Sequence, residues 1–260
     1  MLIQQVLKLT VILITLLITG CAANSKAGAN NKDPFESLNR ASYGFNSAID
    51  KVILKPVAKG YDAVTPKPVK TGISNFFSNL DEIRTVINDI LQGKLADGFN
   101  DSARFLINST IGLAGFIDVA SDIGFTEHDE DFDQTLGVWG INTGPYIVIP
   151  FLGPSTVRGV LSRPVDSYSS LVRDVDHIPT RNSIYATELI DLRYRLLAID
   201  GQLEDAIDEY SFVRDAFLMR NEYQVYDGSP PEEDDLYDYD LENVDCAEDD
   251  KECGKNKIID

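Results

Sequence analysis

Two segments of this 260-residue chain combine the apolar face of an amphipathic helix with a second, polar line of residues. In residues 33–56 the apolar positions recur at steps that average close to 3.6, the period of an α-helix. Beside them a polar line runs at steps of four, three and four residues: Asn39, Tyr43, Asn46 and Asp50. Residues 94–111 repeat this spacing with Asp97, Asp101, Arg104 and Asn108, and carry Phe99, Leu106 and Ile107 on the far side.

This double pattern has two interpretations. A helix on a water-soluble domain has one apolar stripe and one broad polar face, so both polar lines could simply face water. Alternatively, lipid covers the apolar side and the polar residues face a cavity, because polar groups within a bilayer are costly unless they face a cavity or one another. The periodicity alone leaves both interpretations open.

Residues 140–159, GINTGPYIVIPFLGPSTVRG, are apolar in the middle yet contain four glycines and three prolines. Proline inside a helix removes a hydrogen bond and clashes with the preceding turn, so the stretch does not read as an ordinary helix. It is also too short to span a bilayer, which takes about 20 apolar residues. Irregular backbone at membrane depth occurs only where it packs in protein or lines a cavity. The stretch is therefore interpreted as a stiff, irregular wall beside a lipid path.

The N-terminus predicts a lipoprotein signal peptide, residues 1–20. Lys8 precedes a short apolar run, which ends in LITGC at Cys21. Small residues directly before a cysteine, with no second apolar span after it, indicate lipidation of Cys21 rather than simple secretion. Ala22, instead of the aspartate that retains enteric lipoproteins in the inner membrane, favours the outer membrane and its periplasmic face. Residues 21–32 read as a polar linker that reaches only about 20 Å, so the folded part begins at the bilayer surface.

The charge of the chain excludes nucleic acid as a partner. The formal net charge is −19, whereas phosphate backbones are bound by clustered Lys and Arg. Most of this charge lies in residues 222–260, which hold fifteen acids and three lysines. Residues 227–260 are acidic and poor in aliphatic side chains, which predicts a disordered tail. Cys246 and Cys253 lie in this tail, where they could form a local disulfide.

Residues 33–226 are predicted to form one mainly helical domain. A helix opens at DPFE, with Asp33 as the N-cap, and ends at Pro56. The other expected helices cover residues 66–77, 81–91 with a stop at Gly93, 94–111, 163–175, 183–199 and 202–222, the last two separated by Gly201. Strand-like alternation is scarce, so the predicted fold class is all-α.

No residue pattern indicates catalysis. The sequence has no GxSxG, HExxH, paired CxxC, phosphate-binding loop or GxGxxG motif. One histidine among the loop acids of residues 128–133 is interpreted as a solvated turn rather than a metal site. His177 stands alone beside two aspartates. We therefore expect no enzyme, no metal and no cofactor apart from the covalent lipid on Cys21.

The sequence resembles the MlaA (VacJ) family of outer-membrane lipoproteins. The likeness spans residues 33 to about 223 and leaves out the acidic tail. Besides the lipobox, it rests on DPFESLNRASYGFN (33–46), KPVAKGYDAVTPKPV (55–69), SNFFSNLDE (74–82), RFLINSTIGLAGFIDVA (104–120), HDEDFDQTLGVWGINTGPYIVIPFLGPSTVRG (128–159) and VRDAFLMR (213–220).

The resemblance implies a ring of amphipathic helices in the inner leaflet of the outer membrane, around a central channel. Mislocalised phospholipids would leave the outer leaflet through this channel and pass to a soluble periplasmic carrier, and a trimeric porin would hold the ring. The alternative is a periplasm-facing lipoprotein that scaffolds other envelope proteins without a channel. An envelope hydrolase has no supporting residues.

The candidate channel residues come from three segments. Two segments are the polar lines, with Phe45 added by position in the family. The third is the glycine-rich loop and the wall after it, where Arg158 could meet a lipid phosphate or form a plain salt bridge. The candidates are Asn39, Tyr43, Phe45, Asn46, Asp50, Arg104, Asn108, Gly140, Asn142, Gly144, Pro145, Tyr146 and Arg158.

Overall fold

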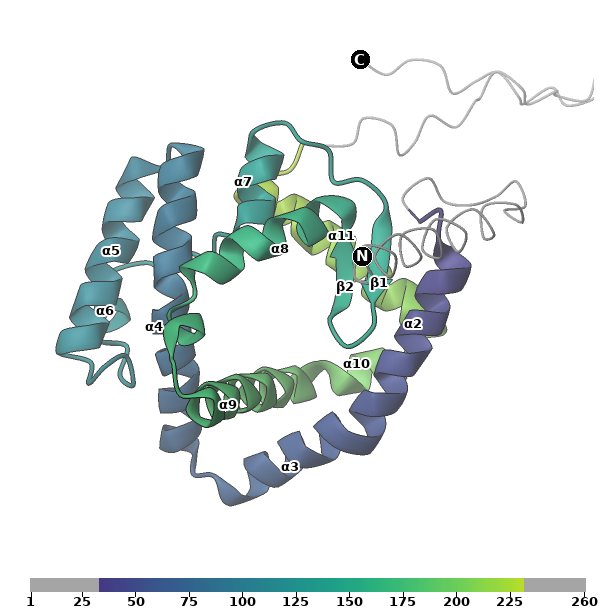
Figure 1. Cartoon of the computed structure of the whole chain (residues 1–260), viewed down its shortest axis with the longest axis horizontal. Coiled ribbons are helices and arrows are strands. Elements are labelled where there is room, and N and C mark those ends of the chain that lie inside the picture. The colour runs from purple at the N-terminus through teal and green to yellow at the C-terminus, as the bar shows by residue number, and fades with distance from the viewer. Residues whose placement is uncertain (1–32, 232–260) are drawn as a thin grey trace, which may run out of the picture.

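The computed structural model describes residues 33–231, and its helices form a ring. Figure 1 shows α2 (Glu36–Ile49), α3 (Lys55–Val64), α4 (Lys67–Gln92), α8 (Val157–Ser169) and the β-hairpin arranged around a central opening. Helix α9 (Ile178–Leu196) runs along the inside of α3. Outside the ring, α5 (Leu95–Thr110) packs against α4 and the short α6 (Val119–Asp122) packs against α5. The all-α prediction is confirmed, apart from a single two-stranded sheet within the described residues. The predicted signal peptide, the lipidation site Cys21, the linker and both tail cysteines lie outside the described residues.

The first helix does not end at Pro56, as the sequence predicts. Helix α2 (Glu36–Ile49) runs through a π-helical turn (Asp50–Leu54) directly into α3 (Lys55–Val64). Pro56 therefore lies directly after the π-helical turn, inside a continuous helical run whose hydrogen-bond ladder its missing N–H interrupts. The change of hydrogen-bond pattern in the π turn accommodates this interruption, and the helix continues past the proline.

The predicted cap of α2 is also wrong. Phe35 occupies the N-cap position and makes no side-chain hydrogen bond there. Asp33 is instead fully buried, and its carboxylate accepts hydrogen bonds from Asn39 Nδ2 at 2.8 Å and from the Tyr210 hydroxyl at 2.5 Å. The aspartate therefore joins the two ends of the domain instead of capping the helix.

Helix α4 (Lys67–Gln92) is one continuous helix where two short ones are predicted. Gly93 ends it in a left-handed conformation, φ +83°, as expected. Helix α5 (Leu95–Thr110) then returns along α4, and α6 (Val119–Asp122) follows a loop that approaches α4 closely. A Cβ on Gly115 would lie 2.7 Å from the side chain of Asn79, so only glycine fits at this contact.

The stretch from residue 140 to 159 is ordered as a β-hairpin and a helix start, which corrects the prediction of an irregular wall. Helix α7 (Phe132–Val138) precedes it, strand β1 (Tyr146–Ile149) pairs antiparallel with β2 (Gly153–Thr156), and Tyr146 faces Thr156 across the sheet. Phe151 in the turn has φ +65°, a conformation that is unfavourable for a bulky residue. The prolines at 145, 150 and 154 flank or edge the strands, where their missing N–H is tolerated.

The C-terminal half also differs from its predicted boundaries. Helix α8 (Val157–Ser169) starts at the end of the hairpin and leads through a 3₁₀ turn (Leu171–Asp174) to α9 (Ile178–Leu196). A second 3₁₀ turn (Leu197–Ile199) and the short α10 (Asp200–Glu204) contain the predicted break at Gly201. The actual break comes later, and Asp208 caps α11 (Glu209–Val225) through the N–H of Tyr210.

Candidate functional site

The burial of side chains is reversed relative to a water-soluble domain. Among the described residues, 21 polar or charged residues are buried but only seven hydrophobic ones. Large apolar side chains lie outside, including Val64 at 80 % exposed, Phe99 at 76 % and Leu106 at 61 %. Water-soluble proteins bury their aliphatic residues and leave charged ones exposed unless these are paired. The arrangement suits a molecule whose outer surface contacts lipid.

The polar line of α2 holds the β-hairpin. Asn39 is buried; its Nδ2 donates to the carbonyl of Tyr146 and its Oδ1 accepts from the N–H of Val148, both at 2.9 Å. Two helical turns further along α2, Asn46 Nδ2 donates to the carbonyl of Ile149 at 3.0 Å and its Oδ1 accepts from the N–H of Phe151 at 2.8 Å. The two asparagines therefore hydrogen-bond backbone N–H and C=O groups at the free edge of β1 and in the hairpin turn. Such edge groups are otherwise left without partners.

Aromatic rings pack on both sides of this contact. The rings of Phe45 and Phe151 meet edge to face with centroids 5.0 Å apart, and those of Tyr43 and Tyr210 do so at 5.8 Å. Tyr43, Tyr146 and Tyr210 belong to a small core with Val148, Phe217 and Leu218. Burial raises the pKa of Tyr43 to about 12, so its hydroxyl stays neutral.

Asp50 connects the first helix to the inside of the ring. Arg193 of α9 donates from Nε to Asp50 at 2.6 Å and from its terminal nitrogen to Asp200. Lys55 pairs with Asp200 at 2.9 Å. These hydrogen bonds and the neighbouring cations hold the pKa of Asp200 below its usual range, although burial opposes the shift. The network fixes α9 and α10 against the π turn.

The second polar line lies buried between α4, α5 and α6. Arg104 is 1 % exposed, and its Nε donates to Glu82 of α4 at 2.8 Å. Asn108 donates to Asp118 at 2.9 Å and accepts from the N–H of Ala120 at 2.9 Å. Burial raises the pKa of Glu82 to about 7, and the hydrogen bond from Arg104 opposes this shift.

A pair of carboxyl groups lies next to this network. Asp89 of α4 and Asp101 of α5 are both fully buried, and neither oxygen of Asp89 accepts a hydrogen bond from a donor among residues 33–231. Asp101 pairs with His128 Nδ1 at 2.9 Å. Burial, followed by the neighbouring Asp101, raises the pKa of Asp89 to about 7. Asp89 therefore takes up a proton near neutral pH.

Arg158 forms the salt bridge that was the alternative to a phosphate contact. Its Nε donates to Asp133 at 2.7 Å, and its terminal nitrogens donate to Asn221 Oδ1 at 2.9 Å and to the carbonyl of Ile141 at 3.1 Å. The guanidinium is 3 % exposed and joins α7, α8 and α11. Glu130 and Asp133 are buried as well, so the solvated turn expected at residues 128–133 is wrong in part. Lys94 pairs with Glu130 at 2.9 Å.

The glycine-rich loop lies between α7 and the hairpin. Gly140 and Gly144 have φ of +86° and +69°, which L side chains rarely adopt. Gly140 closes α7, since its N–H donates to the carbonyl of Gly137 at 2.8 Å. Asn142 Oδ1 accepts from the N–H of Gly144 at 2.8 Å, and the carbonyl of Pro145 accepts from the N–H of Val157 at 3.1 Å.

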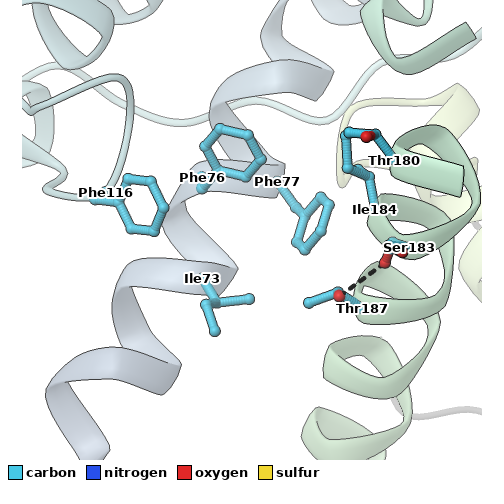
Figure 2. A pocket seen from close by; sticks show the side chains of 8 residues that line it. All are labelled: Ile73, Phe76, Phe77, Phe116, Thr180, Ser183, Ile184 and Thr187. Atoms are coloured by element: carbon cyan, nitrogen blue, oxygen red, sulfur yellow. Dashed lines mark hydrogen bonds between the residues drawn. The ribbon is translucent and has the colours of Figure 1, made fainter. Parts of the chain in front are cut away.

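Two adjoining cavities open between α4 and α9, and neither is predicted from the sequence. The apolar pocket, about 250 Å³, is lined by Ile73, Phe76, Phe77, Phe116 and Ile184 together with small hydroxyl residues of α9. Figure 2 shows Phe77 facing Ile184 and Thr187, with Phe76 and Phe116 on the other side of Phe77. The polar cavity, about 500 Å³, is larger and shares Phe77 as a wall. Its charged lining includes Asp81, Arg84, Asp129, Glu188, Arg195 and Arg220.

The comparisons with known proteins agree with this architecture. The model of the MlaA lipoprotein family matches residues 31–224. This chain belongs to the MlaA family. It is 34 % identical over 242 residues to the intermembrane phospholipid transport system lipoprotein MlaA of Escherichia coli (strain K12), covering 88 % of this chain and 96 % of that protein. It is also 34 % identical to the protein of that name from Haemophilus influenzae, over 85 % of this chain and 90 % of the relative.

A solved family structure shares the fold. It comes from work on the structural basis for maintenance of bacterial outer membrane lipid asymmetry, and it aligns with a TM-score of 0.67 at 32 % identity. The alignment covers 74 % of this chain and 98 % of that one. Over residues 33–231, no helix has both the length and the apolar character needed to cross a bilayer. The MlaA fold is thus built from amphipathic helices with polar contacts inside and apolar side chains outside.

Proposed function

We propose that this chain is the outer-membrane lipoprotein that removes mislocalised phospholipids from the outer leaflet and passes them onward. The observation that carries the proposal is the reversed burial in this helical ring (Figure 1), in which large apolar side chains are exposed and polar and charged ones are buried. The relatives in Escherichia coli and Haemophilus influenzae are named as lipoproteins of an intermembrane phospholipid transport system. Transfer of a lipid between membranes changes no covalent bond, so the proposed activity is transport and not catalysis.

The ring lies in the inner leaflet, facing the periplasm, with its apolar faces in contact with acyl chains. Cys21 carries the lipid anchor after removal of residues 1–20, and residues 21–32 tether the ring to the membrane. Exposed apolar residues of the first helix run support this placement, such as Val52 and Ile53 in the π-helical turn between α2 and α3. Burying such side chains in lipid is favourable by roughly 25 cal/mol for each Å².

The path for lipid runs through the inside of the ring. The polar line of α2 holds the hairpin that closes this ring, and the loop from Gly140 to Tyr146 links α7 to that hairpin. Arg104 and Asn108 are not part of this path, because they are buried between α4, α5 and α6, outside the ring. Proposed partners are a trimeric porin, which holds the ring at the membrane, and a soluble periplasmic carrier, which receives the phospholipid. Neither nucleic acid nor a metal cofactor has a role in this proposal.

The test is complementation. A host strain that lacks its own family member accumulates phospholipid in the outer leaflet if the proposal holds, and expression of this chain lowers that amount to the wild-type level. The measurement is outer-leaflet phospholipid by surface-accessible enzymatic labelling, with the amount of protein quantified in parallel. A chain that reaches the outer membrane at normal levels but leaves outer-leaflet phospholipid unchanged contradicts the proposal and favours the scaffold role.

A further inference from the structure

The polar cavity and the apolar pocket form one amphipathic site between α4 and α9. Along both helices the residues that line the site change from apolar to charged in the direction of the chain. Ile73, Phe76 and Phe77 of α4 are followed by Asp81 and Arg84 at the polar cavity. On α9, Ile184 lines the apolar pocket and Glu188 and Arg195 line the polar cavity.

The dimensions suit an amphipathic ligand. From Ile73 to Arg84 the helix advances by roughly 16 Å, at 1.5 Å per residue. The polar cavity, about 500 Å³, falls within the usual range of ligand sites, roughly 300–1,000 Å³. The apolar pocket, about 250 Å³, is smaller and fits a segment of an acyl chain. Phe77 belongs to both, so a head group and the adjoining chain segment can occupy the two spaces at once.

Two arginines of the polar cavity, Arg84 and Arg195, have guanidinium N–H groups without a hydrogen-bond partner among the described residues. Arg84 donates to Asp129 at 2.9 Å, but its Nε is buried and has no hydrogen-bond partner among the described residues. Arg195 pairs only through Nε, with Asp191 at 3.3 Å, and its terminal nitrogens remain available. A phosphate group accepts several such hydrogen bonds, and arginine is well suited to supply them.

Carboxyl groups outnumber arginines in the lining of the cavity, which contains Asp81, Glu127, Asp129 and Glu188 beside Arg84, Arg195 and Arg220. Glu188 makes no hydrogen bond or ion pair within residues 33–231, and the nearest cationic nitrogen to Asp81 is Arg84 at 3.9 Å. Burial raises the pKa of Glu188, the neighbouring Asp81 adds to this shift, and Arg84 and Arg195 oppose it. Asp129 is paired more closely, with Arg84 and Arg220. Glu188 and Asp81 therefore keep carboxylate oxygens that accept no hydrogen bond within residues 33–231, beside guanidinium groups that offset their charge only in part.

We infer that this site selects a phospholipid whose head group carries both a phosphate and an ammonium, as phosphatidylethanolamine does. The phosphate meets the free donors of Arg84 and Arg195, the ammonium meets Glu188 and Asp81, and a segment of acyl chain enters the apolar pocket. An anionic head group without an amine would add negative charge to a partly buried lining in which carboxyl groups already outnumber arginines, which is unfavourable. The inference rests on the proposed function and adds the class of lipid that the ring prefers.

The experiment measures which phospholipid the full, lipid-anchored protein retains. The protein is purified in detergent, mixed with micelles of phosphatidylethanolamine and phosphatidylglycerol in equal amounts with matched acyl chains, and passed through gel filtration. Mass spectrometry then counts each head group per protein. We expect the wild type to enrich phosphatidylethanolamine about threefold, as an ion pair in a partly solvated site predicts.

Two sets of variants assign the selectivity to the cavity. E188Q alone and E188Q with D81N should bring the ratio of the two lipids toward one while total phospholipid is retained; D205N, at an exposed aspartate outside the cavity, should keep the wild-type ratio. R195Q should lower the retention of both lipids, whereas R181Q should not. Circular dichroism confirms that each variant is folded before its lipid content is compared.

The outcomes separate the two proposals. A wild type that retains both lipids in the supplied ratio, or an E188Q variant that keeps the enrichment, overturns the head-group inference and leaves phospholipid transport standing. A wild type that retains no phospholipid at all overturns both.

Discussion

Asn39 pairs with the backbone of Val148 as a neighbouring β-strand would, although it lies on a helix. Its amide oxygen accepts from the N–H of Val148 and its amide nitrogen donates to the carbonyl two residues earlier, both at 2.9 Å. Asn46, two helical turns further on, repeats the contact at the hairpin turn. The polar line of α2 thus replaces a third strand, and the hairpin is held in the ring by four hydrogen bonds.

The hairpin contact predicts graded effects of two substitutions. N46A removes the two bonds at the turn, frees Phe151 from its unfavourable φ, and should lower the free energy of unfolding by about 1–2 kcal/mol. N39A should cost more, because it also removes the donor to Oδ1 of the buried Asp33 and leaves only the bonds to Oδ2. Hydrogen exchange at the amides of Val148 and Phe151 reports each loss separately. S47A, on the same helix, is the matched control; equal exchange in N46A and S47A would contradict this role.

The spacing of the polar lines could be predicted from the sequence, but their partners could not. The step of four, three and four residues places Asn39 and Asn46 on one helix face, and likewise Arg104 and Asn108. The backbone groups that Asn39 and Asn46 contact lie about 100 residues away in the sequence. The partners of Arg104 and Asn108 lie on or beside the neighbouring α4 and α6. A single sequence contains no signal for either pairing. For this reason Arg104, with its Glu82 partner, is buried between helices instead of being an isolated charge on a channel wall.

Predictions of element boundaries from local sequence were wrong where contacts with distant parts of the chain determined the structure. Pro56 reads as a helix end, yet a π turn carries the helix past it. Tyr146 to Ile149 is apolar throughout, and only the burial of alternate side chains reveals the strand. The cavities between α4 and α9 were missed because each helix looks amphipathic by itself, and the change from apolar to polar along their contact appears only when the two helices are placed together.

Gly140 and Gly144 should tolerate substitution differently. Both have positive φ, which costs another residue roughly 1–2 kcal/mol. A Cβ at Gly140 meets nothing within 4 Å, whereas one at Gly144 lies 3.1 Å from Val157 Cβ. G140V should therefore fold with moderate destabilisation, and G144V should shift the start of α8 as well. We expect both to change outer-leaflet phospholipid while protein remains in the membrane.

The control for the loop is G201A, at a helical glycine with open space around it. It should leave both stability and transport unchanged or slightly improve stability. Normal transport by G140V and G144V, or failure that follows only from loss of protein, would mean that the loop is a structural brace.

Stability should increase as the pH falls from about 7.5 to 5. Asp89 and Glu82 have folded-state pKa values raised to about 7. At a pH above the pKa that these groups have in the unfolded chain, the native state therefore binds more protons than the unfolded state. Stability then falls as pH rises through this window. The raised pKa of His128 acts in the same direction, because its contribution is lost as it deprotonates.

D89N tests the source of this dependence. The introduced amide carries no negative charge into this buried position, so it should stabilise the protein at pH 7.5 by on the order of 2 kcal/mol and flatten the pH profile. D122N, at an exposed aspartate, serves as the control. The profile comes from thermal unfolding at each pH, and an unchanged slope in D89N would assign the dependence to other groups.

The acidic segment after Gly228 should be dispensable for transport. Gly228 ends α11, since its N–H donates to the carbonyl of Tyr223 at 2.9 Å, and Lys94 pairs with Asp227 just before it. Residues beyond this point contain too few aliphatic side chains to offset the entropy of ordering them. Truncation after Gly228 should keep outer-leaflet phospholipid at the wild-type level. A loss as large as that of a full deletion would show that the tail acts in transport.

The most direct test of the account is whether the ring stays in the membrane without its lipid anchor. C21S, combined with a cleavable signal peptide, removes the anchor and leaves residues 33–231 unchanged. The exposed apolar side chains around a polar interior predict that the protein still fractionates with membranes, needs detergent for extraction and brings phospholipid with it. Recovery of C21S as a detergent-free, lipid-free soluble monomer would contradict the embedded ring.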